Sequence, residues 1–167
     1  MNPTKYRDDV ALLAKTDQTK AVEIAEKIND PWFRAQAWAH IARYADRPLV
    51  YARKAAKSAA KTKDDYQRSS VRAWEIAALS ERGLCEQARQ ALAEAVSLAV
   101  AVPQEGSKAE ALLLLFQAAL KVGVDDAQRI AAVMRDNVSI EHWRGERALK
   151  LVSAMLEGRE TSREFFW

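Results

Sequence analysis

Apolar residues along the chain recur with the spacing of an amphipathic helix. Residues 20–28 read KAVEIAEKI and residues 126–134 read DAQRIAAVM, so apolar residues occupy the same four positions in both: Ala, Ile and Ala, followed by Ile in the first and Met in the second. These positions, i, i+3, i+4 and i+7, lie on one face of a helix. A second pattern joins residues 35–42, AQAWAHIA, to residues 109–116, AEALLLLF, and looser copies occur over 68–79 and 144–152. The pattern therefore predicts repeated helical pairs.

Turn residues separate the predicted helices. Asp30 precedes Pro31, which is the order expected of an N-cap acid followed by a proline in the first helical position. Asp46-Arg47-Pro48 marks a second break in the same way. Glycine follows three later helices, where a C-terminal cap with a positive φ favours this residue. These glycines are Gly83, Gly123 and Gly158.

Four helical pairs account for the whole pattern. They run over 17–29 with 31–45, 48–62 with 65–82, 85–101 with 107–122, and 125–136 with 139–157, after a short capping helix over 5–15. Equivalent core positions, at Ile41, Ile76, Leu115 and Leu151, are 35, 39 and 36 residues apart. We expect an all-α fold, in which one α-solenoid domain covers 1–158 with repeats of about 17–46, 47–83, 84–123 and 124–158. An aromatic tail follows over 159–167.

The Ile24-Ala25 and Ile130-Ala131 pairs stand in the first helix of their repeats. On these positions and on the pairing of helices, the chain resembles the tetratricopeptide-like and HEAT-like α-solenoid superfamily over nearly its whole length. The tetratricopeptide pattern has a Leu-Gly pair at this place, and most of its aromatic, glycine and proline positions are unmet here. The resemblance is therefore one of architecture. It implies a scaffold, adaptor or chaperone-like protein that binds a peptide or a helix on a curved face.

Composition agrees with a helical globular domain. The 167 residues include 32 alanines but only 5 glycines and 4 prolines, and alanine favours helices most. Hydrophobic residues make up 49% and charged residues 29%, as in a folded chain. No apolar run has the length of a signal peptide or a membrane span, and Cys85 has no second cysteine to pair with. We therefore expect a cytoplasmic protein that has no membrane partner.

No arrangement of catalytic or metal-binding residues stands out. The two histidines, His40 and His142, lie in different repeats, and neither belongs to an H-E-x-x-H motif. The single cysteine, Cys85, provides no zinc framework, and no glycine-rich phosphate loop or G-x-S-x-G motif occurs. We expect a non-enzymatic protein without cofactor or metal. An enzyme whose site is not visible in the sequence is the alternative.

A basic segment is the main candidate for a binding surface. Residues 47–72 contain eight basic and two acidic residues, and several of the basic ones are three or four positions apart, which places them on one helical face. The candidate contacts are Arg53, Lys54, Lys57, Lys61, Arg68 and Arg72. We expect this face to bind an acidic peptide or helix of a protein partner. Nucleic-acid binding through residues 47–72 and a merely solvated face are the alternatives.

Aromatic residues mark two further features. Trp38 lies on the apolar stripe of its helix and is expected in the core. Trp32, in the first turn, either packs on the preceding helix as a staple or faces a ligand. The tail ends in Phe165, Phe166 and Trp167. It either covers the open apolar edge of the last helical pair or docks into a partner or a second copy of the chain.

Overall fold

The computed structural model describes residues 2–160, and every regular element in that range is an α helix. The helices in chain order are α1 (Pro3–Leu13), α2 (Gln18–Lys27), α3 (Pro31–Tyr44), α4 (Pro48–Ala59), α5 (Asp65–Ser70), α6 (Arg72–Glu81), α7 (Cys85–Val100), α8 (Glu105–Val122), α9 (Val124–Asn137) and α10 (Trp143–Leu156). The all-helical fold predicted from the sequence is confirmed.

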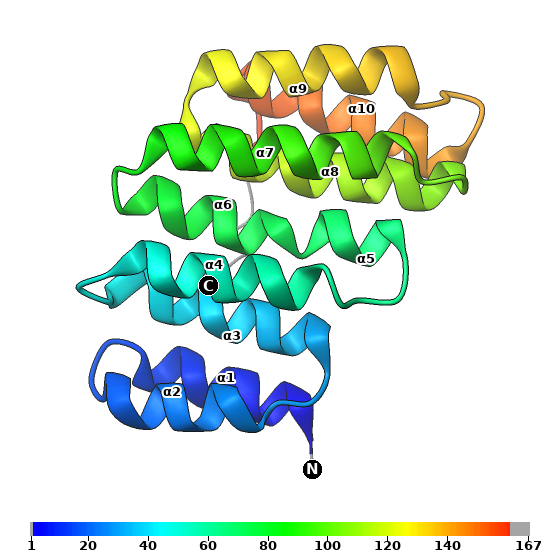
Figure 1. Cartoon of the computed structure of the whole chain (residues 1–167). Helices are drawn as coiled ribbons and strands as arrows, with labels where there is room; N and C mark the ends of the chain where they lie inside the picture. The colour runs from blue at the N-terminus through cyan, green and yellow to red at the C-terminus, as the bar shows by residue number, and fades with distance from the viewer. Residues whose placement is uncertain (1, 161–167) are drawn as a thin grey trace.

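The helices pack in two rows that follow the order of the chain (Figure 1). Helices α1, α3, α6, α8 and α10 form the first row, in which each contacts the next. Helices α2, α4, α7 and α9 form the second row, and they pack mainly on members of the first row. In Figure 1 the second row lies toward the viewer, with α2 below and α9 above.

The core lies along the first row. Every residue from Ala35 to Ala42 of α3 is buried, and α6 and α8 are buried over most of their length. Alanine allows helix backbones to approach closely, while Ile41, Ile76 and Phe116 fill the space between them. Trp38 is 4% exposed, which confirms its predicted place in the core. Helices α2, α4, α7 and α9 bury only one stripe each, as amphipathic surface helices do.

The helix caps follow the turn signals at most positions. The Asp30 side chain accepts from the backbone N–H groups of the next helix, at 2.9 Å from Trp32 N and 3.3 Å from Phe33 N. Gly83 and Gly158 have φ values of 72° and 71°, the left-handed conformation that favours glycine. Gly123 differs from the prediction, because its φ is 170°, an extended conformation open to any residue. It is the single residue between α8 and α9, so the chain turns there directly into the next helix.

Two helix boundaries also differ from the prediction. The structure divides the predicted helix over 65–82 at Val71, although Val71 keeps helical angles, with φ −68° and ψ −20°. Trp74 N donates to Val71 O at 3.3 Å, so one turn is tightened rather than broken. Helix α10 begins at Trp143 rather than at 139, because His142 forms its cap and accepts from Arg144 N at 3.2 Å.

Candidate functional site

A groove of about 440 Å³ runs between α4 and α7, which pack side by side on α6. Leu49, Ala52, Arg53 and Ala56 of α4 form one wall, and Gln87, Gln90, Ala91 and Glu94 of α7 form the other. Arg72, Glu75 and Leu79 of α6 form the floor. The amphipathic faces of α4 and α7 therefore frame a concave surface whose floor belongs to the core row.

At the floor of the groove, one arginine forms ion pairs with two glutamates. Arg72 Nε donates to Glu75 Oε2 at 2.5 Å, and Arg72 Nη1 donates to Glu94 Oε2 at 3.1 Å. Glu75 is 6% exposed, and burial raises the pKa of its carboxyl while the Arg72 guanidinium opposes that shift. The predicted contact Arg72 thus has its charge balanced by its neighbours and supports the groove from below.

Arg53 adds positive charge to the α4 wall of the groove, and two further cations follow it along the chain. Arg53, Lys57 and Lys61 are exposed. Arg53 and Lys57 lie on the same face of α4, one turn apart, and Lys61 follows just after the helix ends. None of the three takes part in an ion pair with another residue of the 2–160 range. We call Arg53, Lys57 and Lys61 the basic stripe.

The other predicted contacts are engaged elsewhere. Lys54 Nζ lies 3.5 Å from Glu26 Oε1 and 4.3 Å from the centroid of a Trp38 ring, so it bridges α4 to α2 and α3. Arg68 Nη1 pairs with Asp65 Oδ1 at 2.9 Å within α5.

The two predicted aromatic sites have different outcomes. Trp32 is half-buried and packs edge-to-face on Trp74, with ring centroids 6.0 Å apart. This contact favours a packing role for the side chain. The predicted docking tail, Phe165, Phe166 and Trp167, lies outside the described residues.

An apolar pocket of about 360 Å³ adjoins the groove at the beginning of α4. Its lining consists of Arg47, Pro48, Leu49, Val50, Arg53 and Leu84, and it shares Leu49 and Arg53 with the groove. Val50 is 38% exposed. Sequence reasoning missed this pocket. The available signal was the apolar stretch Pro48-Leu49-Val50, which lies between Arg47 and Arg53 in the sequence.

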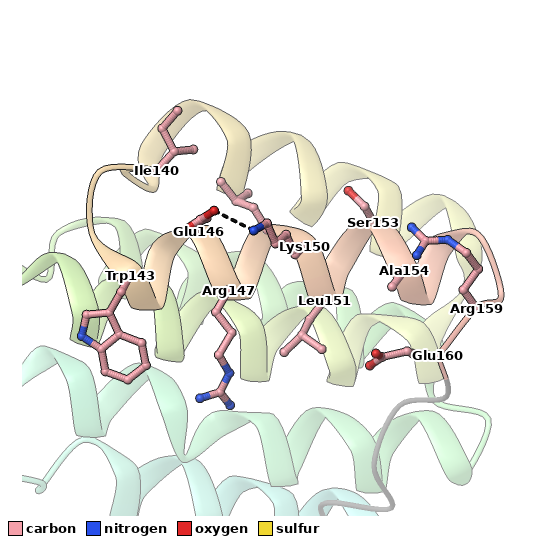
Figure 2. Close-up of a pocket in the computed structure, with 11 residues that line it drawn as sticks. Ile140, Trp143, Glu146, Arg147, Lys150, Leu151, Ser153, Ala154, Arg159 and Glu160 are labelled. Atoms are coloured by element: carbon pink, nitrogen blue, oxygen red, sulfur yellow. Dashed lines mark hydrogen bonds and ion pairs between the residues drawn. The ribbon is translucent and has the colours of Figure 1, made fainter.

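A larger hollow of about 790 Å³ lies along α10 (Figure 2). Trp143 and Ile140 are 60% and 69% exposed, and Trp143, Arg147 and Leu151 point to the same side of the helix. Two of the three basic residues that line it have carboxylate partners. Glu146 accepts from Lys150 Nζ at 2.6 Å, and Arg159 pairs with Glu157 at the same distance. Charge on this surface is therefore more balanced than on the basic stripe.

Polar groups on the first row form contacts between neighbouring helices. Arg7 Nη1 donates to Gln36 Oε1 at 2.7 Å, and Glu81 pairs with Arg43 at 2.7 Å and with Lys121 at 3.1 Å. These interactions tie α1 to α3 and α3 to α6 and α8.

The two histidines and the cysteine occupy separate places. His40 is 6% exposed, and burial lowers its pKa to about 4, with further contributions from Arg43 and Arg7. His142 caps α10, and Cys85 is half-buried at the start of α7. Within the described part of the chain, no cluster of His, Cys, Asp and Glu side chains is suited to hold a metal ion.

Comparison with known protein families, with curated proteins and with solved structures found no match to this chain. Among the described helices, none is both long and apolar enough to span a membrane.

Proposed function

We propose that the protein is a non-enzymatic interaction module with the architecture of an α-solenoid, built from four helical pairs after α1. The order of helix contacts supports this proposal, because each helix of the first row packs on the next one and each second-row helix packs beside it. Such stacking makes an elongated surface with shallow grooves, which suits an extended peptide or a helix of a partner. A cytoplasmic scaffold or adaptor agrees with this architecture.

The proposed ligand is an acidic peptide of a protein partner, which binds in the groove between α4 and α7. The basic stripe carries this proposal, because Arg53 lines the groove, Lys57 and Lys61 follow it along the chain, and none of the three is in an ion pair with another described residue. An acidic segment would supply those partners without disturbing the Arg72–Glu75 pair below. The exposed amides of Gln87 and Gln90 on the opposite wall can both donate to and accept from a peptide backbone.

The experiment is a selection from a random-peptide phage library on the immobilised protein. The enriched peptides are then synthesised and measured by fluorescence anisotropy. We expect acid-rich peptides whose binding is lost in the triple variant Arg53→Glu, Lys57→Glu, Lys61→Glu. The matched control replaces three exposed lysines of α2 and of the turn before it, Lys15→Glu, Lys20→Glu and Lys27→Glu, with the same change in net charge. Equal loss in both variants, or enrichment of peptides without acidic residues, would contradict the proposal.

Nucleic-acid binding through the same stripe is the second candidate, and salt distinguishes it. A nucleic acid that contacts these three cations would release counterions and give a slope of about −3 for a duplex and about −2 for a single strand in log Kobs against log salt. Titration of fluorescent single- and double-stranded oligonucleotides at increasing salt measures that slope. Oligonucleotide binding with this slope, lost in the stripe variant and kept in the control, would replace the peptide proposal.

A further inference from the structure

The apolar pocket at the beginning of α4 lies at one end of the groove and is flanked by cations on two sides. Leu49, Val50 and Leu84 provide its apolar surface, and Arg47 and Arg53 provide the charge. Val50 is 38% exposed, because alanines form the face of α4 that packs on the core and Val50 lies on another face. A concave apolar surface with a few charged groups at its border can receive an apolar side chain of a partner.

We propose that the partner peptide carries a bulky apolar side chain that enters this pocket, with acidic side chains on both sides of it. This inference rests on the proposed function, since it specifies the ligand of the same surface. The apolar side chain would bury Leu49, Val50 and Leu84, and the two carboxylates would meet Arg47 and Arg53. Charge complementarity thus selects a peptide that combines both features, rather than a purely acidic run or a purely apolar one.

The separation of the two arginines sets the spacing of the acids. Arg47 is the N-cap residue before α4 and Arg53 lies six positions further, which corresponds to about 9 Å along the helix axis at 1.5 Å per residue. A peptide in the polyproline II conformation advances about 3.1 Å per residue and returns to the same face at every third residue, so two acidic side chains three positions apart would span the same distance. The apolar residue lies between them. Beyond Arg53, further acidic residues of the peptide would reach Lys57 and then Lys61, along the basic stripe.

The test uses three synthetic peptides and two matched variants. The first peptide has two glutamates three positions apart with a leucine between them, followed by further glutamates. In the second, alanine replaces the leucine, and in the third the two glutamates are adjacent and follow the leucine. The variants are Val50→Asp in the pocket and Val124→Asp at the exposed start of α9, where Val124 is 63% exposed. Circular dichroism checks that each variant is folded.

We expect the first peptide to bind best, with the alanine peptide weaker by about 10-fold or more, because a buried leucine side chain contributes that much. The Val50→Asp variant should lose at least the same factor for the first peptide and less for the alanine peptide, which is weakened only by repulsion between the new carboxylate and its glutamates, while Val124→Asp should leave both unchanged. The peptide with adjacent glutamates should bind more weakly than the first.

Failure of this inference is distinguishable from failure of the proposed function. If the leucine and alanine peptides bind equally, and both need the basic stripe, the groove binds acidic peptides but the apolar anchor is wrong. If Val50→Asp has no effect on the leucine peptide, the anchor lies elsewhere and the inference is also wrong. If none of the peptides binds, or if the stripe variant binds them as well as the control does, the proposed function fails together with the inference.

Discussion

His40 should make the stability of the fold depend on pH below neutrality. Its imidazole is 6% exposed on α3, and burial is the main cause that lowers its pKa from 6.5 to about 4. Arg43 and Arg7 lower the pKa further, whereas Asp8 and Glu81 raise it. The folded protein therefore keeps His40 neutral at a pH at which the unfolded chain already binds a proton. Because the unfolded state binds more protons in this range, stability falls as the pH falls from about 6.5 toward 4.

The size of the effect follows from the two pKa values. With 6.5 in the unfolded chain and about 4 in the folded protein, His40 alone should lower the free energy of unfolding by about 2 kcal/mol between about pH 7.5 and about pH 5. A domain of this size has a urea m-value of about 2 kcal/mol/M, so the urea midpoint should fall by about 1 M. Above about pH 7.5 the contribution should be nearly constant, because both states are neutral there.

Urea titrations followed by tryptophan fluorescence at the two pH values measure this difference. The variant His40→Gln removes the titrating group, so the fall in midpoint on acidification should become smaller by about 1 M. Ile76→Val is the control, because it removes one buried methyl group and adds no titrating group. It should lower the midpoint at both pH values and leave their difference unchanged. A His40→Gln variant that keeps the full wild-type pH dependence would refute the reasoning.

The remaining predictions concern stability and can be measured by urea or thermal unfolding. Glu75→Ala should destabilise the fold by about 3 kcal/mol, because it leaves the buried Arg72 guanidinium with only its outer partner; a loss below about 1 kcal/mol would contradict a buried pair. Gly145→Ala should lower the melting temperature strongly, since a Cβ there collides with the Ser139 carbonyl oxygen; an unchanged melting temperature would show that this close approach is wrong. Asp30→Ala should cost about 1 kcal/mol, whereas Asp30→Asn should cost much less because it keeps the cap acceptor.

Sequence periodicity predicted the helices well because helices are local structures. The 3.6-residue spacing relates residues of the same helix, and Asp30-Pro31 and Gly83 each act on the helix end beside them. Helix α3 accordingly begins at Pro31, as expected. The tightened turn at Val71 left no comparable signal, since its angles remain helical. The late start of α10 depends on His142 as a cap, and histidine is not a preferred N-cap residue.

The candidate site was harder to predict because charge neutralisation depends on tertiary contacts. Periodicity put Lys54 and Lys57 in one basic group. In the structure the two side chains leave α4 in different directions, so Lys54 pairs with Glu26 of α2 while Lys57 is exposed. Arg72 is neutralised in part by Glu94, which lies on the next helix along the chain. The Arg68–Asp65 and Arg72–Glu75 pairs, each three positions apart within one helix, are the exceptions that spacing alone could have identified.

The basic stripe and the apolar pocket contribute to the binding free energy in different ways, and this difference decides which class of ligand the proposed site prefers. Exposed ion pairs contribute about 0–1 kcal/mol each, so the whole basic stripe supplies no more than a few kcal/mol and loses part of it in salt. A single apolar side chain buried in the pocket beside Val50 contributes about 1.5–3 kcal/mol and is largely insensitive to salt. A phosphate backbone can use the stripe but has no group for the pocket. The pocket between Arg47 and Arg53 is therefore the feature that separates a peptide partner from a nucleic acid, although both would be attracted by the same charge.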